Sequence, residues 1–241
     1  VRSTVLVLGH QAEAVEKTIR SGSTAVPDLR IAMQAEPRGT ADAVRSALPK
    51  LPDDAGRVLI LYGDTPLLTQ ERLRALCQAG EDVTLALLTT RLADPTGYGR
   101  VIFSDDGLPA RIVEEKDCTA EERKLSLVNA GMYSVDAEFL RQALLEVREN
   151  NAQRELYLTD LLALARAHGK SVAAVEANPE EVQGVNDRVD LAHAEQILRR
   201  RINTAHLRRG VTLRDPAATY IDDTVEIDRD AELGSGVVLR G

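Results

Sequence analysis

Tryptophan is absent from this sequence of 241 residues, and aromatic residues of all kinds make up only 3% of it. The core must therefore be built from aliphatic side chains. Only two cysteines, Cys77 and Cys118, are present, which argues against a disulfide framework or a zinc site and favours a reducing cytoplasm. The sequence contains no run of about 18 apolar residues and no signal-peptide pattern, so we expect no membrane-spanning segment.

Positive charge is also scarce, because 30 Lys and Arg face 38 Asp and Glu and leave a net charge of −8 at pH 7. A nucleic-acid-binding protein needs a net or local excess of positive charge to neutralise phosphates, so nucleic acid is not an expected partner. A small phosphorylated substrate remains compatible, since one basic pocket can hold it. The 44% of hydrophobic and 28% of charged residues are typical of a soluble globular protein.

Short apolar runs alternate with helical patterns in the first third of the chain. Strands spaced by helices of about ten residues predict βαβ units and a mostly parallel sheet, whose ligands bind beyond the carboxyl ends of the strands. Val58–Leu61 is predicted to be the most buried of these strands, with Asp64 shortly after it. The predicted strands are 4–8, 29–34, 58–61 and 83–89, and the predicted helices are 12–19, 41–48 and 70–79.

The middle of the chain has a more alternating pattern, which predicts a β-hairpin around a turn at Asp105–Gly107. The hairpin strands are expected at 100–103 and 110–114, a further strand at 127–136, and helices at 136–148 and 158–168. Asp187–Arg209 then reads as one long charged helix linking two domains, with Arg199–Arg201 on a solvated face. Its apolar residues form one narrow stripe, namely Leu191, Ala194, Leu198 and Ile202.

The last segment has a period of six residues, because Ile227, Leu233 and Leu239 recur at that spacing. The smaller Ala231 and Val237 follow the first two of them by four positions. Such hexapeptide periodicity is typical of a parallel β-helix, in which one large residue in six points into a narrow prism. We therefore expect 210–241 to be the start of such a solenoid.

Asp64 stands in the stretch "LYGDTPLL", after a glycine that would allow a ligand close to the backbone. A carboxylate at the end of a strand suits Mg²⁺, which takes one or two protein oxygens and fills its other positions with water and phosphate. Alternatively, Asp64 is a turn residue that caps the helix after Pro66. The local sequence leaves both interpretations open.

Gly39 and Thr40, in "QAEPRGTADA", stand at the start of a predicted helix, where backbone N–H groups and a hydroxyl can bind an anion or a base edge. Gln34 could read a base through its amide. A plain loop with Thr40 as helix N-cap is the simpler alternative for this stretch.

Further candidates stand in a glycine-rich turn, at the ends of predicted strands or at the starts of helices, and those at strand ends could hydrogen-bond a sugar. Each has a structural alternative, either as a turn or surface residue or, for the last two, as a helix cap. These candidates are Gly99 in "DPTGYGR", Glu114 in "IVEEKD", Asn129 in "LVNAG", Tyr157 and Thr159 in "ELYLTD", and Asn186 in "QGVNDR".

The order of these motifs, followed by a long helix and hexapeptides, closely resembles one family over essentially the whole chain. It is the bacterial bifunctional enzyme that is both N-acetylglucosamine-1-phosphate uridyltransferase and glucosamine-1-phosphate N-acetyltransferase. The resemblance implies an α/β, Rossmann-like nucleotidyltransferase (pyrophosphorylase) domain at 1–186, a linker helix at 187–209 and the first coils of a left-handed parallel β-helix at 210–241. It also implies a cytoplasmic protein whose full-length form is a homotrimer through that β-helix.

The same resemblance implies Mg²⁺-dependent transfer of UMP from UTP to N-acetylglucosamine 1-phosphate, with release of pyrophosphate. Asp64 and Asn186 would hold the metal. The uridine nucleotide would contact Gln34, Gly39, Thr40, Tyr62 and Gly63, and the N-acetylglucosamine moiety would contact Gly99, Glu114, Asn129, Tyr157 and Thr159.

The family has a glycine-rich loop that carries an Arg and wraps the UTP phosphates, and a Lys follows it. Neither the loop nor this Lys occurs in these residues, which is one departure from the family. Most of the acetyltransferase β-helix does not occur here either. We therefore expect the chain as given to be inactive in both reactions. A metal-dependent glycosyltransferase-like enzyme and a non-catalytic sugar-nucleotide-binding domain are the competing interpretations.

Overall fold

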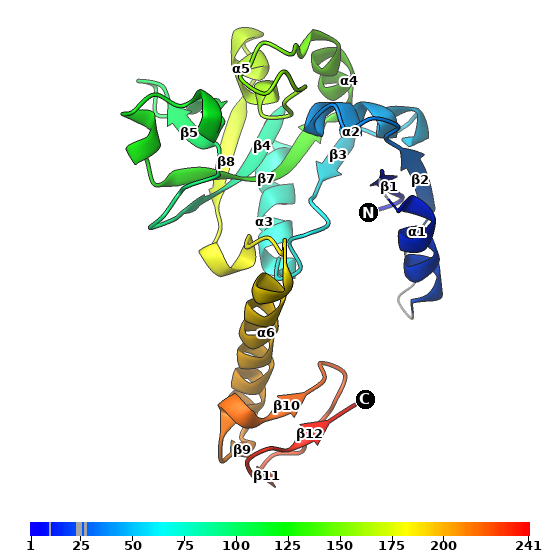
Figure 1. The fold of residues 1–241 in the computed structure, drawn as a ribbon, viewed down its shortest axis with the longest axis vertical. Helices are drawn as coiled ribbons and strands as arrows, with labels where there is room; N and C mark the ends of the chain where they lie inside the picture. Colours follow the sequence, from blue (N-terminus) through cyan, green and yellow to red (C-terminus); the bar gives the residue numbers. More distant parts are fainter. Residues whose placement is uncertain (10, 23–25, 27) are drawn as a thin grey trace. The chain divides into compact units, whose positions relative to one another are not determined.

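The computed structural model describes residues 1–9, 11–22, 26 and 28–241, which fall into two compact units. The first unit contains Val1–Tyr62 and Gln70–Ala177, and the second contains Gly63–Thr69 and Asn178–Gly241. Figure 1 follows the chain from blue to red through both units. None of the helices in the described ranges is long and apolar enough to span a membrane.

The main sheet of the first unit has six strands, in the order β6-β5-β7-β4-β8, with β3 also beside β7. Strands β3, β4 and β5 pair antiparallel with β7, β6 pairs antiparallel with β5, and β8 pairs parallel with β4. The expectation of a mostly parallel sheet is therefore wrong, and the sheet is mixed. Its strands are β3 (Arg57–Ile60), β4 (Leu85–Arg91), β5 (Arg100–Phe103), β6 (Pro109–Val113), β7 (Leu127–Asp136) and β8 (Val172–Glu176).

The two N-terminal strands, β1 (Thr4–Leu8) and β2 (Leu29–Met33), form a separate parallel pair. Helix α1 (Ala12–Ser21) connects them, and α2 (Thr40–Ala47) follows β2. This is the parallel βαβ arrangement that the spacing of the first apolar runs predicts. Single 3₁₀ turns complete the two units, at Leu48–Lys50, Glu115–Asp117, Glu122–Lys124, Pro179–Glu181 and Pro216–Ala218.

Strand β3 is not the most buried strand, which corrects the prediction for Val58–Leu61. Three of its four residues are half-buried, and Leu61 lies beyond its end with 43% of its surface exposed. Burial is greatest in β4 and β7. The physical reason is position in the sheet, since β3 pairs with β7 alone among the described strands, whereas β4 has a neighbour on each side.

Helices cover both faces of the main sheet, as the alternation of side chains along its strands requires. Leu85 and Tyr133 join one apolar cluster with α4 (Ala137–Glu146) and α5 (Asp160–Ala167), above the sheet in Figure 1. Ser134 points to the opposite face, where it meets Gly80 of α3 (Gln70–Glu81). The apolar cluster on the face of α4 and α5 is mostly aliphatic, and Tyr133 and Phe139 are its aromatic members.

The second unit is organised around α6 (Arg188–Arg209), which begins after the N-cap Asp187. The predicted apolar stripe is partly wrong, because Leu191 and Leu198 are exposed, while Ala194 and Ile197 are buried. The latter two pack against Leu67 from the other segment of this unit. That contact is between residues far apart in sequence, so the helical pattern alone could not select the buried side.

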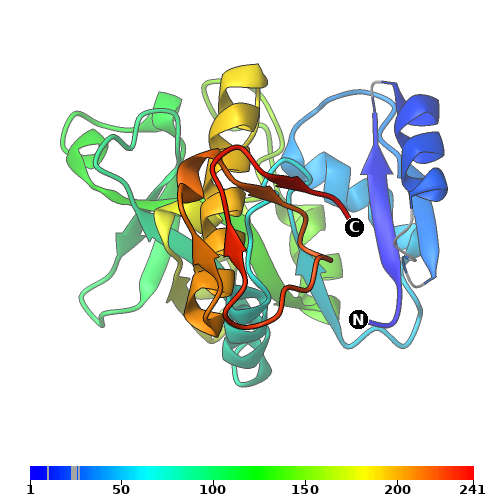
Figure 2. The same cartoon turned by 90° about the horizontal axis from the view of Figure 1, so that it is seen from below.

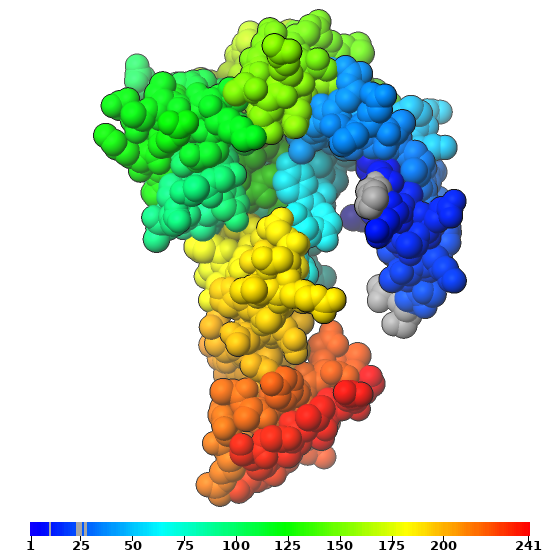
Figure 3. All heavy atoms as spheres, in the orientation of Figure 1, coloured from blue at the N-terminus to red at the C-terminus, as the bar shows by residue number. Residues whose placement is uncertain are grey.

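The C-terminal coils contain β9 (Thr212–Leu213), β10 (Tyr220–Ile221), β11 (Glu232–Leu233) and β12 (Val238–Leu239). Strand β9 pairs parallel with β11, and β10 pairs parallel with β12. These strands, seen from below in Figure 2 and with all atoms in Figure 3, surround a small cluster of aliphatic residues. Ile227, Leu233 and Leu239, the residues of the six-residue period, all pack against that cluster.

Candidate functional site

The loop before α2 is held by backbone geometry that only glycine allows. Gly39 has a φ of +112°, and a Cβ at this position would lie 2.5 Å from the carbonyl oxygen of Leu156. The side-chain Nε2 of Gln34 donates to the Gly39 carbonyl over 3.1 Å and to Asp42 over 3.0 Å. Gln34 therefore fixes this loop with one end of its amide, which leaves Oε1 as the end that can accept from a base.

Thr40 does not act as the cap of its own helix, which removes the simpler interpretation of this residue. Gly39 is the N-cap of α2, and no side chain caps it. The Thr40 hydroxyl accepts instead from the backbone N–H of Leu158 over 3.0 Å. Two backbone hydrogen bonds, Leu156 N–H to Arg38 and Ala41 N–H to Leu156, join the same two segments. The predicted nucleotide loop is thereby tied to the segment that carries Tyr157 and Thr159.

Thr159 links this segment to Glu114. Its hydroxyl donates to the Glu114 carboxylate over 3.1 Å, and it makes no cap hydrogen bond to α5. Burial raises the pKa of Glu114, while the bond from Thr159 acts in the opposite direction. Gly99 lies against the same carboxylate, because a Cβ on it would be 3.2 Å from Glu114 Oε2 and 2.8 Å from Ile112.

Tyr157 has its ring buried and its hydroxyl directed to Gln153, to which it donates over 3.0 Å. Burial, with surrounding carboxylates, raises the pKa of Tyr157 to about 12, so its hydroxyl remains protonated at neutral pH. Its hydrogen is donated to Gln153, so the neutral hydroxyl oxygen remains as an acceptor.

Asn129 is buried, and both its backbone and its side chain are hydrogen-bonded. Its backbone N–H donates to the Gly99 carbonyl over 2.8 Å, its Nδ2 donates to the hydroxyl of Tyr133 over 2.8 Å, and its Oδ1 accepts from Gly131 N–H over 3.1 Å. Gly131 has a φ of +77° and lies against the ring of Tyr62, where a Cβ would come within 2.2 Å of a ring carbon. Gly99, Glu114, Asn129 and Thr159 therefore belong to one connected group in the first unit.

Asp64 and Asn186 come together in the second unit, although they are far apart in sequence. Val185 N–H donates to the Asp64 carbonyl over 2.8 Å. A Cβ built on Gly184 would lie 3.8 Å from both Asp64 Oδ2 and Asn186 Nδ2, so these two exposed side chains flank the same glycine. Gly63, just before Asp64, is exposed, and a Cβ there would meet nothing within 4 Å.

The capping alternatives for these two residues are wrong. Asp187, and not Asn186, caps α6, by accepting from the N–H groups of Val189 and Asp190. Helix α3 begins at Gln70, too far along the chain for Asp64 to be its N-cap. The donor set of one carboxylate and one amide suits the few protein oxygens that Mg²⁺ takes. No cluster of three or more His, Cys, Asp or Glu suited to a metal occurs within the described ranges.

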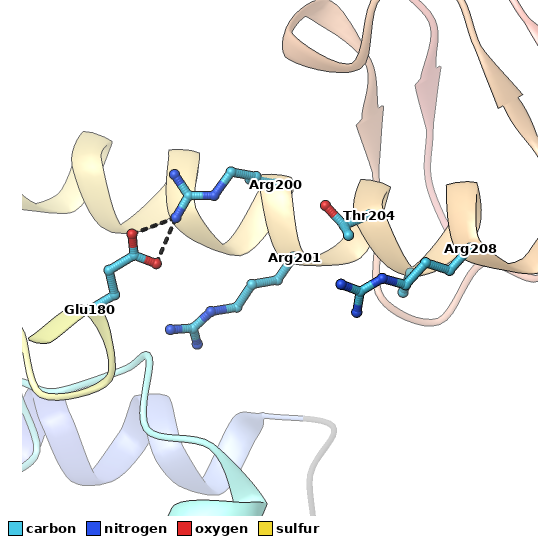
Figure 4. Close-up of a pocket in the computed structure, with 6 residues that line it drawn as sticks. Glu180, Arg200, Arg201, Thr204 and Arg208 are labelled. Carbon is cyan, nitrogen blue, oxygen red and sulfur yellow. Dashed lines mark hydrogen bonds and ion pairs between the residues drawn. The ribbon is translucent and has the colours of Figure 1, made fainter. Parts of the chain in front are cut away.

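A hollow of about 350 Å³ lies on α6 and holds none of the predicted site residues. Figure 4 shows the polar residues that line it, which are Glu180, Arg200, Arg201, Thr204 and Arg208. Arg200 pairs with Glu180 at 2.6 Å, Arg201 donates to the Leu67 carbonyl over 2.7 Å, and Arg199 lies 4.4 Å from the ring centre of Tyr220. Arg200 is exposed, as expected of a solvated face, whereas Arg199 and Arg201 are half-buried and have partners within this unit.

Two partners of the predicted site residues, Tyr133 and Asp190, were missed by the sequence analysis. Tyr133 reads as a core residue of β7, and it is fully buried. Asp190 lies on the first turn of α6 and accepts from the Asn186 backbone N–H over 3.0 Å. The spacing of four residues at a helix start could have suggested the Asp190 contact. The Tyr133 contact depends on an irregularity of β7 that the sequence pattern does not reveal.

Residues 1–181 match the family model described as Nucleotidyl transferase, and the chain belongs to that family. It is 51% identical over 237 residues to the Bifunctional protein GlmU of Anaeromyxobacter sp. (strain Fw109-5), and 44% identical over 244 residues to that of Caldanaerobacter subterraneus subsp. tengcongensis. These alignments cover 98% and 100% of this chain, but 48% and 51% of those proteins. The chain thus spans about half the length of these relatives, and the family resemblance is confirmed.

The crystal structure of HddC from Yersinia pseudotuberculosis has the same fold. It superposes with a TM-score of 0.56 at 15% sequence identity, over 80% of this chain and 77% of that one. At this identity the likeness concerns the fold alone. It supports the α/β architecture of this chain.

Proposed function

We propose that this chain carries the uridyltransferase site of a bifunctional enzyme that forms UDP-N-acetylglucosamine. The observation that carries the proposal is the connection between residues 38–41 and 156–159. It joins the predicted nucleotide-contacting residues Gln34, Gly39 and Thr40 to the predicted sugar-contacting residues Thr159 and Glu114 in one hydrogen-bonded group. The names and the identity of the relatives support the same substrates.

In this reaction an oxygen of the N-acetylglucosamine 1-phosphate attacks the α-phosphorus of UTP. A new P–O bond forms, the bond between the α-phosphorus and the bridging oxygen breaks, and pyrophosphate leaves with the electron pair. No side chain needs to act as a nucleophile, so the chain contributes binding and orientation. Gln34 and Thr40 would orient the uridine nucleotide, and Gly99, Glu114 and Asn129 would orient the sugar.

Asp64 and Asn186 would hold Mg²⁺, the divalent ion that suits their oxygen donors. When bound, such an ion neutralises the negative charge of phosphate oxygens that otherwise repel each other. The parallel coils at 210–241 are the proposed start of a left-handed β-helix, through which the full-length protein would form a homotrimer that also acetylates glucosamine 1-phosphate. The domain limits at 186 and 209, and a cytoplasmic location, belong to the same proposal.

The metal proposal is tested by isothermal titration calorimetry of the chain with UDP-N-acetylglucosamine, with Mg²⁺ and with EDTA. We expect Mg²⁺ to strengthen binding to the wild-type chain. The change Asp64→Ala should abolish that gain, because it removes the only carboxylate of the donor pair, while leaving the affinity in EDTA unchanged. Asp223→Ala, an exposed acid of the same unit, is the matched control and should behave as wild type.

A full Mg²⁺ gain in Asp64→Ala would show that the metal binds elsewhere, whereas no binding of UDP-N-acetylglucosamine by the wild-type chain would refute the proposed substrate. For the full-length protein, release of pyrophosphate from UTP only when a sugar 1-phosphate is present would separate this reaction from that of a glycosyltransferase. Since the sequence contains no glycine-rich phosphate loop, we expect the 241 residues alone to bind the product without forming it. Turnover by the chain itself would contradict that expectation.

A further inference from the structure

Strand β7 contains a bulge between Asn129 and Tyr133. On the neighbouring strand β4, Leu87 pairs with Tyr133 and Thr89 pairs with Asn129. One residue therefore separates the pairing positions on β4, and three residues separate them on β7. Gly131, with its φ of +77°, is the middle one of the three residues on β7. Bulges of this kind redirect side chains and are frequent beside functional sites.

The bulge brings together two side chains that a regular strand would keep apart. Residues four positions apart in a regular strand are separated by about 13 Å along its axis. Here the Nδ2 of Asn129 donates to the hydroxyl of Tyr133 over 2.8 Å. Tyr133 is fully buried, and its ring belongs to the main apolar cluster of the first unit. The core therefore holds the Tyr133 hydroxyl in place, and this hydroxyl contacts Asn129, the predicted sugar-contacting residue.

The hydrogen bonds around Asn129 allow one orientation of its side-chain amide. The backbone N–H of Gly131 can only donate, so the atom 3.1 Å from it must be the carbonyl oxygen Oδ1. The amide nitrogen then faces Tyr133, whose hydroxyl accepts from it. One hydrogen on Nδ2 and one lone pair on Oδ1 remain for a ligand. Without Tyr133 the nitrogen would lose its fixed partner, and the amide could rotate.

We propose that Tyr133 is a positioning residue, whose hydroxyl fixes the Asn129 amide across the β7 bulge in the orientation that recognises the N-acetylglucosamine moiety. This inference rests on the proposed function, because it needs Asn129 to contact the sugar. Tyr133 itself does not touch the substrate and acts through Asn129. Its role is specificity for the sugar half of the ligand, while the uridine half depends on other residues.

The test compares the affinities of the 241-residue chain for UDP-N-acetylglucosamine and for UDP by isothermal titration calorimetry. The ratio of the two affinities measures what the sugar contributes. Tyr133→Phe should lower this ratio by about five- to tenfold, the effect of one lost hydrogen bond. The affinity for UDP should stay within about twofold, which also shows that the variant is folded. Asn129→Ala should lower the ratio as well, and adding Tyr133→Phe to it should change nothing further.

Ser134→Ala is the matched control, because it removes a buried hydroxyl from the next residue of β7, on the opposite face of the sheet. Its ratio should equal that of the wild type. In ¹⁵N NMR spectra without ligand, the side-chain NH₂ signals of Asn129 should shift in Tyr133→Phe but not in Ser134→Ala.

An unchanged ratio or unchanged Asn129 signals in Tyr133→Phe would overturn the inference while leaving the proposed function intact. A further loss in the double variant would overturn it too, since Tyr133 would then act independently of Asn129. Equal affinity of the wild-type chain for UDP and UDP-N-acetylglucosamine would overturn both the sugar assignment and this inference.

Discussion

The two compact units of this chain hold their candidate residues in different ways. In the first unit, Glu114, Asn129 and Thr159 are buried or half-buried. Thr159 is hydrogen-bonded to Glu114, and Asn129 to Tyr133, so the folded protein holds these side chains in place. In the second unit, Asp64 and Asn186 are exposed and flank a glycine beside a small apolar cluster. If the proposed roles hold, the sugar-contacting residues would be in place before the ligand binds, whereas the metal-binding residues would be ordered only with the ligand.

The same substitution in each unit gives the sharpest test of this comparison. Leu140→Ala removes a fully buried residue from the large cluster of the first unit and should reduce the free energy of unfolding by about 4 kcal/mol. Leu67→Ala affects a cluster with few members, which can collapse more easily, and should reduce it by about 2 kcal/mol. Urea unfolding followed by circular dichroism measures both. Equal losses would remove the contrast between the units.

Gly131→Ala tests how rigid the bulge of the first unit is. The added Cβ would meet the ring of Tyr62 at 2.2 Å, and the residue would have to keep a φ of +77°. We expect a loss of about 2–3 kcal/mol in the free energy of unfolding, measured by the same urea titration. Gly56→Ala is the control, because a Cβ there meets nothing within 4 Å. An unchanged free energy of unfolding in Gly131→Ala would mean that the bulge can accommodate a Cβ.

The smallest expected effects are two pH dependences of opposite sign in the first unit. Burial raises the pKa of Glu114, so the folded state loses stability as the pH rises from about 4.5 through the folded value, and Glu114→Gln should remove that decline. Hydrogen bonds from Ser104, Leu108 and Arg166 lower the pKa of Asp106 to about 2. Asp106 therefore stabilises the fold above about pH 3.8, and its contribution is lost as the pH falls towards 2.

Urea midpoints measured between about pH 3 and pH 7 check both signs. Asp106→Asn should be less stable than wild type at neutral pH and approach it in acid, whereas Glu114→Gln should be at least as stable as wild type at neutral pH. The reverse order for either variant would contradict the environment described for that carboxyl group.

Much of the local structure could be predicted from the sequence. The strands at 4–8, 29–33 and 127–136 and the helices at 70–81 and 188–209 lie within a few residues of their predicted limits. Period and turn residues determine such elements locally. The direction of strand pairing, the low burial of β3 and the buried side of α6 could not be predicted, because each depends on residues distant in sequence.

The candidate site shows the same division. Motif order alone predicted the identity of its residues, including Asp64 and Asn186, whose roles stay predictions. The bonds of Thr40 to Leu158, of Thr159 to Glu114 and of Asn129 to Tyr133 were not predictable. The first two join segments that only the fold brings together, and the third depends on the bulge.

The sequence by itself therefore determined the kind of protein, the succession of its elements and the residues available for chemistry, since composition, periodicity and motif order are properties of the chain. Only the tertiary structure decided which of those residues meet and which atoms of each remain for a ligand. The physical reason is that hydrogen bonding and burial depend on distances of a few ångströms between side chains. In this chain those distances are set by sheet pairing and by the bulge at Gly131.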